Sequence, residues 1–107
     1  MLPRTREVII EERRQLKIIY GELFDTTTAL LFRLDPIGIN YKTNTDEYEP
    51  EVGTILPRLK SCQSRDDVCR IVHEEFVRWF GDARPQKNYE LIAAELWELW
   101  QKFNAKL

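Results

Sequence analysis

Apolar residues recur at helical spacing through the first third of the chain. Four of them stand seven residues apart: Ile9, Leu16, Leu23 and Leu30. Positions spaced in this way line one side of a helix, and the pattern predicts one long helix over residues 4–34. Gly21 and the threonine run at 26–28 leave two shorter helices as the alternative. Pro36 ends the segment, since it keeps the residue before it out of the helical region.

Residues 35–46 interrupt the helical pattern with turn-forming residues. Three apolar side chains, Ile37, Ile39 and Tyr41, lie within this otherwise polar stretch. We therefore expect one long ordered loop that packs down on the helices.

Helical spacing resumes in three further segments. Pro50 suits the first turn of one helix, and Pro57 should kink it. Ser64 can cap the next helix, which Gly81 ends, and a last helix follows. The helix after Ser64 should bury one apolar face, formed by Val68, Ile71, Val72, Phe76, Trp79 and Phe80. The chain thus reads as a single domain over residues 1–107, an all-α bundle of four or five helices with a long first helix.

Composition and charge narrow the function classes. The 107 residues are 43% hydrophobic and 32% charged, with a net charge of −2. This balance argues against a nucleic-acid binder, which needs a cationic face for the phosphates. No apolar run approaches the roughly 20 residues that span a bilayer, and the amino terminus lacks the pattern of a secretory signal. We expect a cytoplasmic protein with reduced thiols that binds neither nucleic acid nor membrane.

The chain offers few side chains for catalysis or metal binding. His73 is the only histidine, and a zincin motif would need a second one where Val77 stands. Cys69 and His73 lie four residues apart, but with Cys62 they make three ligands where a structural zinc site needs four. We expect no catalytic residue, no metal and no cofactor. A small metal-dependent enzyme built on His73 is an alternative.

Acidic and aromatic residues gather between positions 35 and 51. Carboxylates at a helix start usually compensate the helix dipole, but an acidic patch can also attract a basic partner. We predict that this segment binds another protein. The predicted contact residues are Asp35, Asn40, Tyr41, Asp46, Glu47, Tyr48, Glu49 and Glu51.

The last helix carries a wide apolar arc. Trp97 lies about 100° from Leu96 around the helix axis, and Leu91 and Leu99 widen the arc. Such an arc is typical of burial on two sides, or of a tryptophan exposed for an interface. Trp97 is therefore a further candidate contact residue, and a homodimer through this helix is the alternative to binding a different protein.

Two short motifs resemble a known family. Leu34-Asp35-Pro36-Ile37-Gly38 and Glu47-Tyr48-Glu49-Pro50-Glu51, followed by an apolar helix, are similar to the YugE-like bacterial proteins of unknown function. The resemblance covers the central half of the chain and implies a helical fold without catalytic residues. Small acidic helical proteins of this kind are also similar to immunity proteins that accompany secreted toxins. The resemblance implies a non-catalytic, immunity-like interaction module.

Overall fold

The structure, a computed structural model, describes residues 6–36, 48–81 and 88–106. Within these ranges the chain forms five α-helices, one 3-10 helix and no strand, so the all-α prediction is confirmed. The elements are α1 (Arg6–Tyr20), α2 (Glu22–Leu34), α3 (Glu49–Ile55), η1 (Leu56–Ser61), α4 (Arg65–Phe80) and α5 (Tyr89–Ala105).

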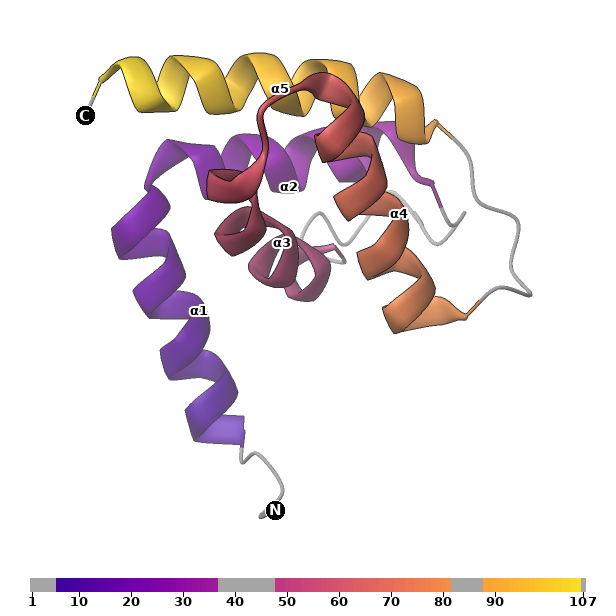
Figure 1. Ribbon diagram of the computed structural model, residues 1–107. Helices are drawn as coiled ribbons and strands as arrows, with labels where there is room; N and C mark the ends of the chain where they lie inside the picture. Colours follow the sequence, from indigo (N-terminus) through magenta and orange to yellow (C-terminus); the bar gives the residue numbers. More distant parts are fainter. Residues whose placement is uncertain (1–5, 37–47, 82–87, 107) are drawn as a thin grey trace.

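A sharp corner at Gly21 separates α1 from α2 (Figure 1). Gly21 has φ 55° and ψ −127°, a conformation that glycine adopts without the steric cost of a Cβ. Its N–H donates a 2.8 Å hydrogen bond to the Lys17 carbonyl and closes α1. The rings of Tyr20 and Phe103, with centroids 5.9 Å apart, hold the corner against α5. The prediction of one long first helix was therefore wrong, and the chain forms two helices here.

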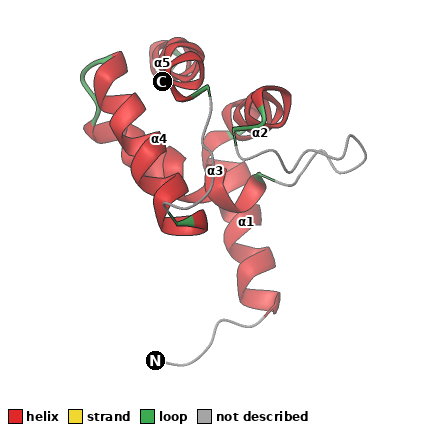
Figure 2. Cartoon of the chain, turned by 90° about the vertical axis from the view of Figure 1, so that its right-hand side faces the viewer, coloured by secondary structure: helices red, strands yellow, loops and turns green. Residues whose placement is uncertain are grey.

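The helices α2, α3, η1, α4 and α5 form a compact body, from which α1 projects. α2 and α5 run antiparallel and side by side, and α4 makes its most extensive contact with α5 (Figures 1 and 2). In both views the first turns of α1 extend beyond the other helices. The direction of α1 is thus set at Gly21.

The core is built from the helices of the body. Its most deeply buried large side chains include Phe24, Leu31, Tyr48, Ile55, Leu59, Ile71, Phe76, Ile92 and Leu96. From α1, the described side chains that pack against this core are Leu16 and Tyr20, and both are only partly buried.

Several helices begin or end at the residues that the local sequence signals predicted. The Ser64 hydroxyl accepts a hydrogen bond from the Asp67 N–H at 3.3 Å and caps α4. Gly81 ends that helix with φ 78°. The regular α-helix gives way to η1 at Leu56, one residue before Pro57, where the sequence predicted a kink.

The predicted long loop lies mostly outside the described residues. Asp35 is described, and it ends α2 in a left-handed conformation with φ 46°. Its N–H donates to the Leu31 carbonyl at 2.8 Å. Residues 37–47 are not described, so the packing of Ile37, Ile39 and Tyr41 stays a prediction.

Candidate interaction surface

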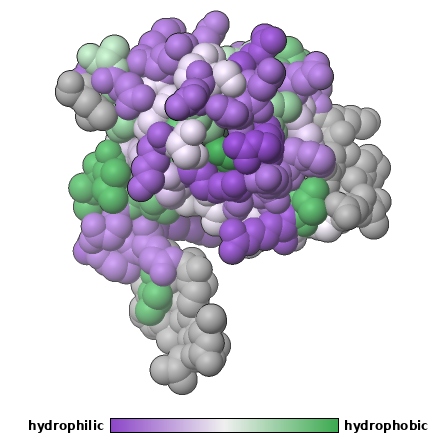
Figure 3. Space-filling view, viewed as in Figure 1, coloured by the Kyte–Doolittle hydropathy of each residue, from purple (hydrophilic) through white to green (hydrophobic). Residues whose placement is uncertain are grey.

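Large apolar side chains are exposed along α1. Val8, Ile10, Ile18 and Ile19 are 44%, 55%, 70% and 62% exposed. Figure 3 shows hydrophobic patches at the corner of α1 with α2 and towards the amino-terminal end of α1, with hydrophilic side chains between them. An exposed apolar patch such as the one at the corner of α1 with α2 is typical of a site that another molecule covers.

The opposite side of α1 holds the helix to the body. Leu16 lies against α3, where a Cβ added to Gly53 would come within 3.1 Å of its Cδ1 atom. Arg13 and Lys17 form ion pairs with Glu49 at 3.7 Å and 3.4 Å. These contacts come from one side of the helix and leave the other side to solvent.

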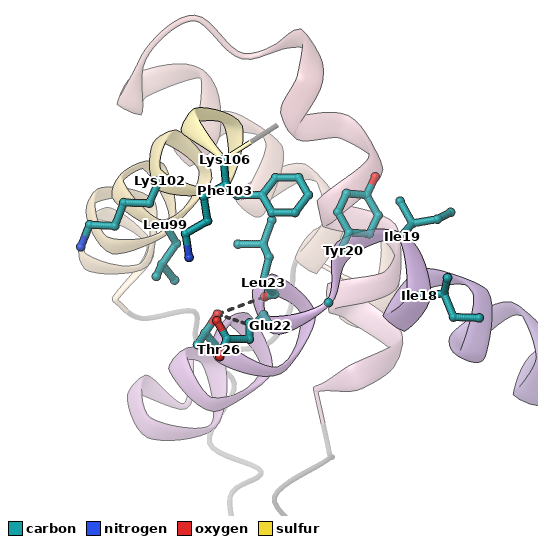
Figure 4. Close-up of a pocket in the computed structure, with 11 residues that line it drawn as sticks. Ile18, Ile19, Tyr20, Glu22, Leu23, Thr26, Leu99, Lys102, Phe103 and Lys106 are labelled. Carbon is teal, nitrogen blue, oxygen red and sulfur yellow. Dashed lines mark hydrogen bonds between the residues drawn. The ribbon is translucent and has the colours of Figure 1, made fainter.

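A groove opens where α1, α2 and the end of α5 meet. It has a volume of about 360 Å³, and we call it the corner groove (Figure 4). Its residues are Ile18, Ile19, Tyr20, Gly21, Glu22, Leu23, Thr26, Leu99, Lys102, Phe103 and Lys106. Phe103 faces Leu23 and Tyr20, and the Lys102 and Lys106 chains extend from the same helix at the rim. The groove is apolar inside and cationic at that rim.

Trp79 lies at the surface, contrary to its predicted place in the core. The side chain is 45% exposed, and its Nε1–H donates to the Thr54 hydroxyl at 3.0 Å. It borders a second groove with Leu16 and Pro50, between α1, α3 and α4. The helical spacing had placed Trp79 beside Phe76, but in the last turn of α4 it is Phe80 that packs against Phe76, with ring centroids 5.8 Å apart.

The described part of the predicted acidic contact segment is directed into the fold. Tyr48 is fully buried, and its hydroxyl donates a 2.7 Å hydrogen bond to Asp35 Oδ1. Glu49 is partly buried between Arg13 and Lys17 of α1. Glu51 is buried. The other predicted contacts, Asn40, Tyr41, Asp46 and Glu47, lie outside the described residues, and the partner-binding role of the segment stays a prediction.

Glu51 is an ionisable group placed in the core. The residue is 4% exposed, and its Oε2 atom has no hydrogen-bond partner in the structure as described. Burial raises the pKa of Glu51 to about 7, against the opposing effects of a backbone hydrogen bond and the Arg13 charge. The carboxylate is thus costly to the fold in its charged form.

A second buried carboxylate has charged partners. Glu75 is 2% exposed, and its Oε2 atom accepts a 2.8 Å hydrogen bond from Arg58 Nη1. Arg58 Nη2 also donates to Glu74 at 2.6 Å, and Arg78 lies 3.7 Å from Glu75. This cluster joins η1 to α4, which is a structural role.

The candidate chemical residues His73, Cys62 and Cys69 are not grouped as a metal site within the described ranges. His73 is exposed, with its ring centroid 5.4 Å from that of Tyr89. Burial raises the pKa of both the Cys62 and Cys69 thiols, so neither is an activated nucleophile at neutral pH. Over residues 6–36, 48–81 and 88–106, no three His, Cys, Asp or Glu side chains are grouped to hold a metal ion.

Trp97 is partly buried and packs against the core. Among the large apolar side chains of α5, Leu91 is the exposed one, at 56%. The wide apolar arc of α5 is therefore used largely inside the fold, and its candidate role as a homodimer contact stays a prediction.

None of the described helices is both long and apolar enough to cross a membrane. The resemblance to YugE-like and immunity proteins stays a prediction. Comparison with known protein families, characterised proteins and solved structures finds no match to this chain.

Proposed function

We propose that the protein is a non-catalytic protein-interaction module and that α1 is its binding element. One observation carries the proposal: Ile18 and Ile19 are 70% and 62% exposed on a helix that projects from the body. Burying apolar surface contributes about 25 cal/mol per Å², so a protein partner that covers these side chains gains affinity.

The surroundings of these isoleucines support the same function. The corner groove continues the apolar surface from α1 onto Leu99 and Phe103 of α5. Lys102 and Lys106 supply charge at its rim, as the polar rim of a protein interface does. The binding of an amphipathic helix in an apolar groove is a common form of protein recognition.

Photo-crosslinking tests this function. We would place a benzophenone amino acid at Ile18, and as a matched control at Lys60, an exposed residue of η1. We expect a discrete protein adduct from position 18 and none from position 60. Excess unlabelled protein should compete for the adduct, whereas an Ile18→Glu/Ile19→Glu variant should not. Equal labelling from both positions would contradict the proposal.

A further inference from the structure

Four exposed residues of α1 repeat with the spacing of a coiled-coil seam. Val8, Glu11, Gln15 and Ile18 follow one another at intervals of three, four and three residues, and all four are exposed. At about 100° per residue they fall within an arc of about 80°. The arc lies opposite the side that contacts the body. We call these four residues the outer seam.

We propose that the outer seam pairs with the outer seam of a second copy of this chain, with the two α1 helices antiparallel. This inference rests on the proposed function, because it names the partner of the same helix. It assigns a homodimer to α1 and not to the arc around Trp97.

The outer seam is complementary to itself when one helix is reversed. In one antiparallel register Val8 lies opposite Ile18 of the second copy, and Glu11 lies opposite its Gln15. The two-fold axis repeats both pairs, so apolar residues meet at the ends and a hydrogen-bond acceptor meets a donor in the middle. Within each helix, Gln15 Nε2 already donates to Glu11 Oε1 at 3.0 Å. A side-chain amide carries two donors, so one N–H remains for the second copy.

The charges of α1 favour the antiparallel orientation. The charged residue of the outer seam is Glu11, and reversal places it beside Gln15 of the second copy instead of beside another carboxylate. A parallel pair would set Glu11 against Glu11 in the middle of the seam, where like charges repel. Antiparallel helix dipoles also attract each other.

The size of the surface predicts a reversible dimer. α1 has 15 residues and is about 22 Å long, so four seam residues cover less than the roughly 800 Å² that each partner buries in a standard interface. The corner groove lies beside Ile18 and adds apolar area under the amino-terminal half of the second copy. We therefore expect dissociation in the micromolar range.

Complementary charge variants test the register. Val8→Lys and Ile18→Glu each place a charge in the seam without touching the core, and each variant alone should dimerise at least about tenfold more weakly than the wild type. An equimolar mixture of the two should recover most of the affinity, because the lysine introduced in one chain then faces the glutamate introduced in the other. Leu91→Lys is the matched control. It changes an apolar residue of α5 that is 56% exposed and lies outside α1, and should leave the dimer unchanged.

Disulfide trapping tests the orientation separately. With Cys62 and Cys69 replaced by alanine, we would mix a Val8→Cys protein with an Ile18→Cys protein under oxidising conditions. The 8–18 heterodimer should dominate. Dominant 8–8 and 18–18 products would overturn the antiparallel arrangement.

Sedimentation of the wild type separates this inference from the proposed function. A strict monomer at about 100 µM, with a position-18 photo-adduct to a different protein, overturns the dimer and leaves the interaction module standing. A strict monomer without any specific photo-adduct overturns both. A dimer whose affinity the charge pair restores supports both.

Discussion

The Tyr48 hydroxyl donates a 2.7 Å hydrogen bond to the Asp35 carboxylate, and this bond joins the end of α2 to the start of α3. The two residues are 13 positions apart in the sequence. Asp35 has a left-handed backbone conformation with φ 46°, and Tyr48 is fully buried. The bond therefore fixes both helix ends at one point of the core.

Removing this hydroxyl should destabilise the fold. We expect Tyr48→Phe to lower the free energy of unfolding by about 1.5–3 kcal/mol, the usual value for a hydrogen bond to a charged group. The matched control is Tyr89→Phe, since both rings pack against Phe76. The Tyr89 hydroxyl is buried, and no partner for it is found in the described residues, so its removal should be neutral or stabilising. Urea denaturation measures both, and equal losses would contradict the assignment.

Glu51 should make the stability depend on pH. Burial raises its pKa to about 7 from 4.5, so the folded state keeps this proton to a higher pH than the unfolded chain. Its contribution to stability then falls as the pH rises from about 4.5 to about 7. We expect Glu51→Gln to raise the free energy of unfolding by about 1 kcal/mol at pH 5 and by up to about 3 kcal/mol at pH 8.

The control for this effect is a neighbouring carboxylate. Glu49→Gln removes the ion pairs with Arg13 and Lys17, and it should lower the stability at pH 8. A Glu51→Gln gain that does not grow between pH 5 and pH 8 would show that Glu51 is not protonated in the fold at pH 5.

The two inter-helix arginines should differ sharply in their importance. Arg58→Met deprives the buried Glu75 carboxylate of its nearest partner, and we expect a loss of about 2–3 kcal/mol. Arg33→Met breaks the pair with Glu95, whose side chains are 61% and 43% exposed, and should cost at most about 1 kcal/mol. Adding Glu75→Gln to Arg58→Met should recover part of the loss. Thermal and urea unfolding would measure the stability of each single variant and of the double variant. Similar losses for the two arginine variants would contradict this prediction.

At position 21 the fold should accept a D-residue but not an L-residue. Its φ of 55° and ψ of −127° are strained for an L-residue, so Gly21→Ala should destabilise the fold by about 1–2 kcal/mol. An L-residue's Cβ at this position meets no described atom within 4 Å, so the cost of Gly21→Ala comes from the backbone conformation, and D-alanine, introduced by chemical ligation at Cys62, adopts these angles readily. The D-variant should therefore equal or exceed the wild type in stability. If the L-variant were the more stable of the two, the corner would not depend on this conformation.

The helices and several of their ends follow from local sequence. Ser64 and Gly81 act on the backbone within one turn, and such signals are visible in a single sequence. The break at Gly21 is different, because the glycine conformation is selected by contacts such as that between Tyr20 and Phe103, which are far apart in the sequence. The sequence therefore left two alternatives at that position.

The proposed binding surface was harder to predict than the fold. The segment around Tyr48 and Glu51 reads as polar and acidic, yet these side chains are buried by helices whose placement the sequence does not reveal. The sequence did contain a signal that α1 exposes apolar side chains. Ile18 and Ile19 are adjacent, and a helix cannot turn both towards the face of Leu16. The apolar periodicity over the first third of the chain indicated a buried face, and the exposure of these two isoleucines was therefore not predicted.

The backbone conformation at Gly21 limits which substitutions the protein can accept at this position during evolution. Any missense change of a glycine codon adds a Cβ, and at this position the penalty arises without a neighbouring side chain that could mutate in compensation. Selection for the direction of α1 would therefore keep glycine at 21 in every lineage that uses the helix. Lineages that lose glycine there should also be free to lose the isoleucines at 18 and 19.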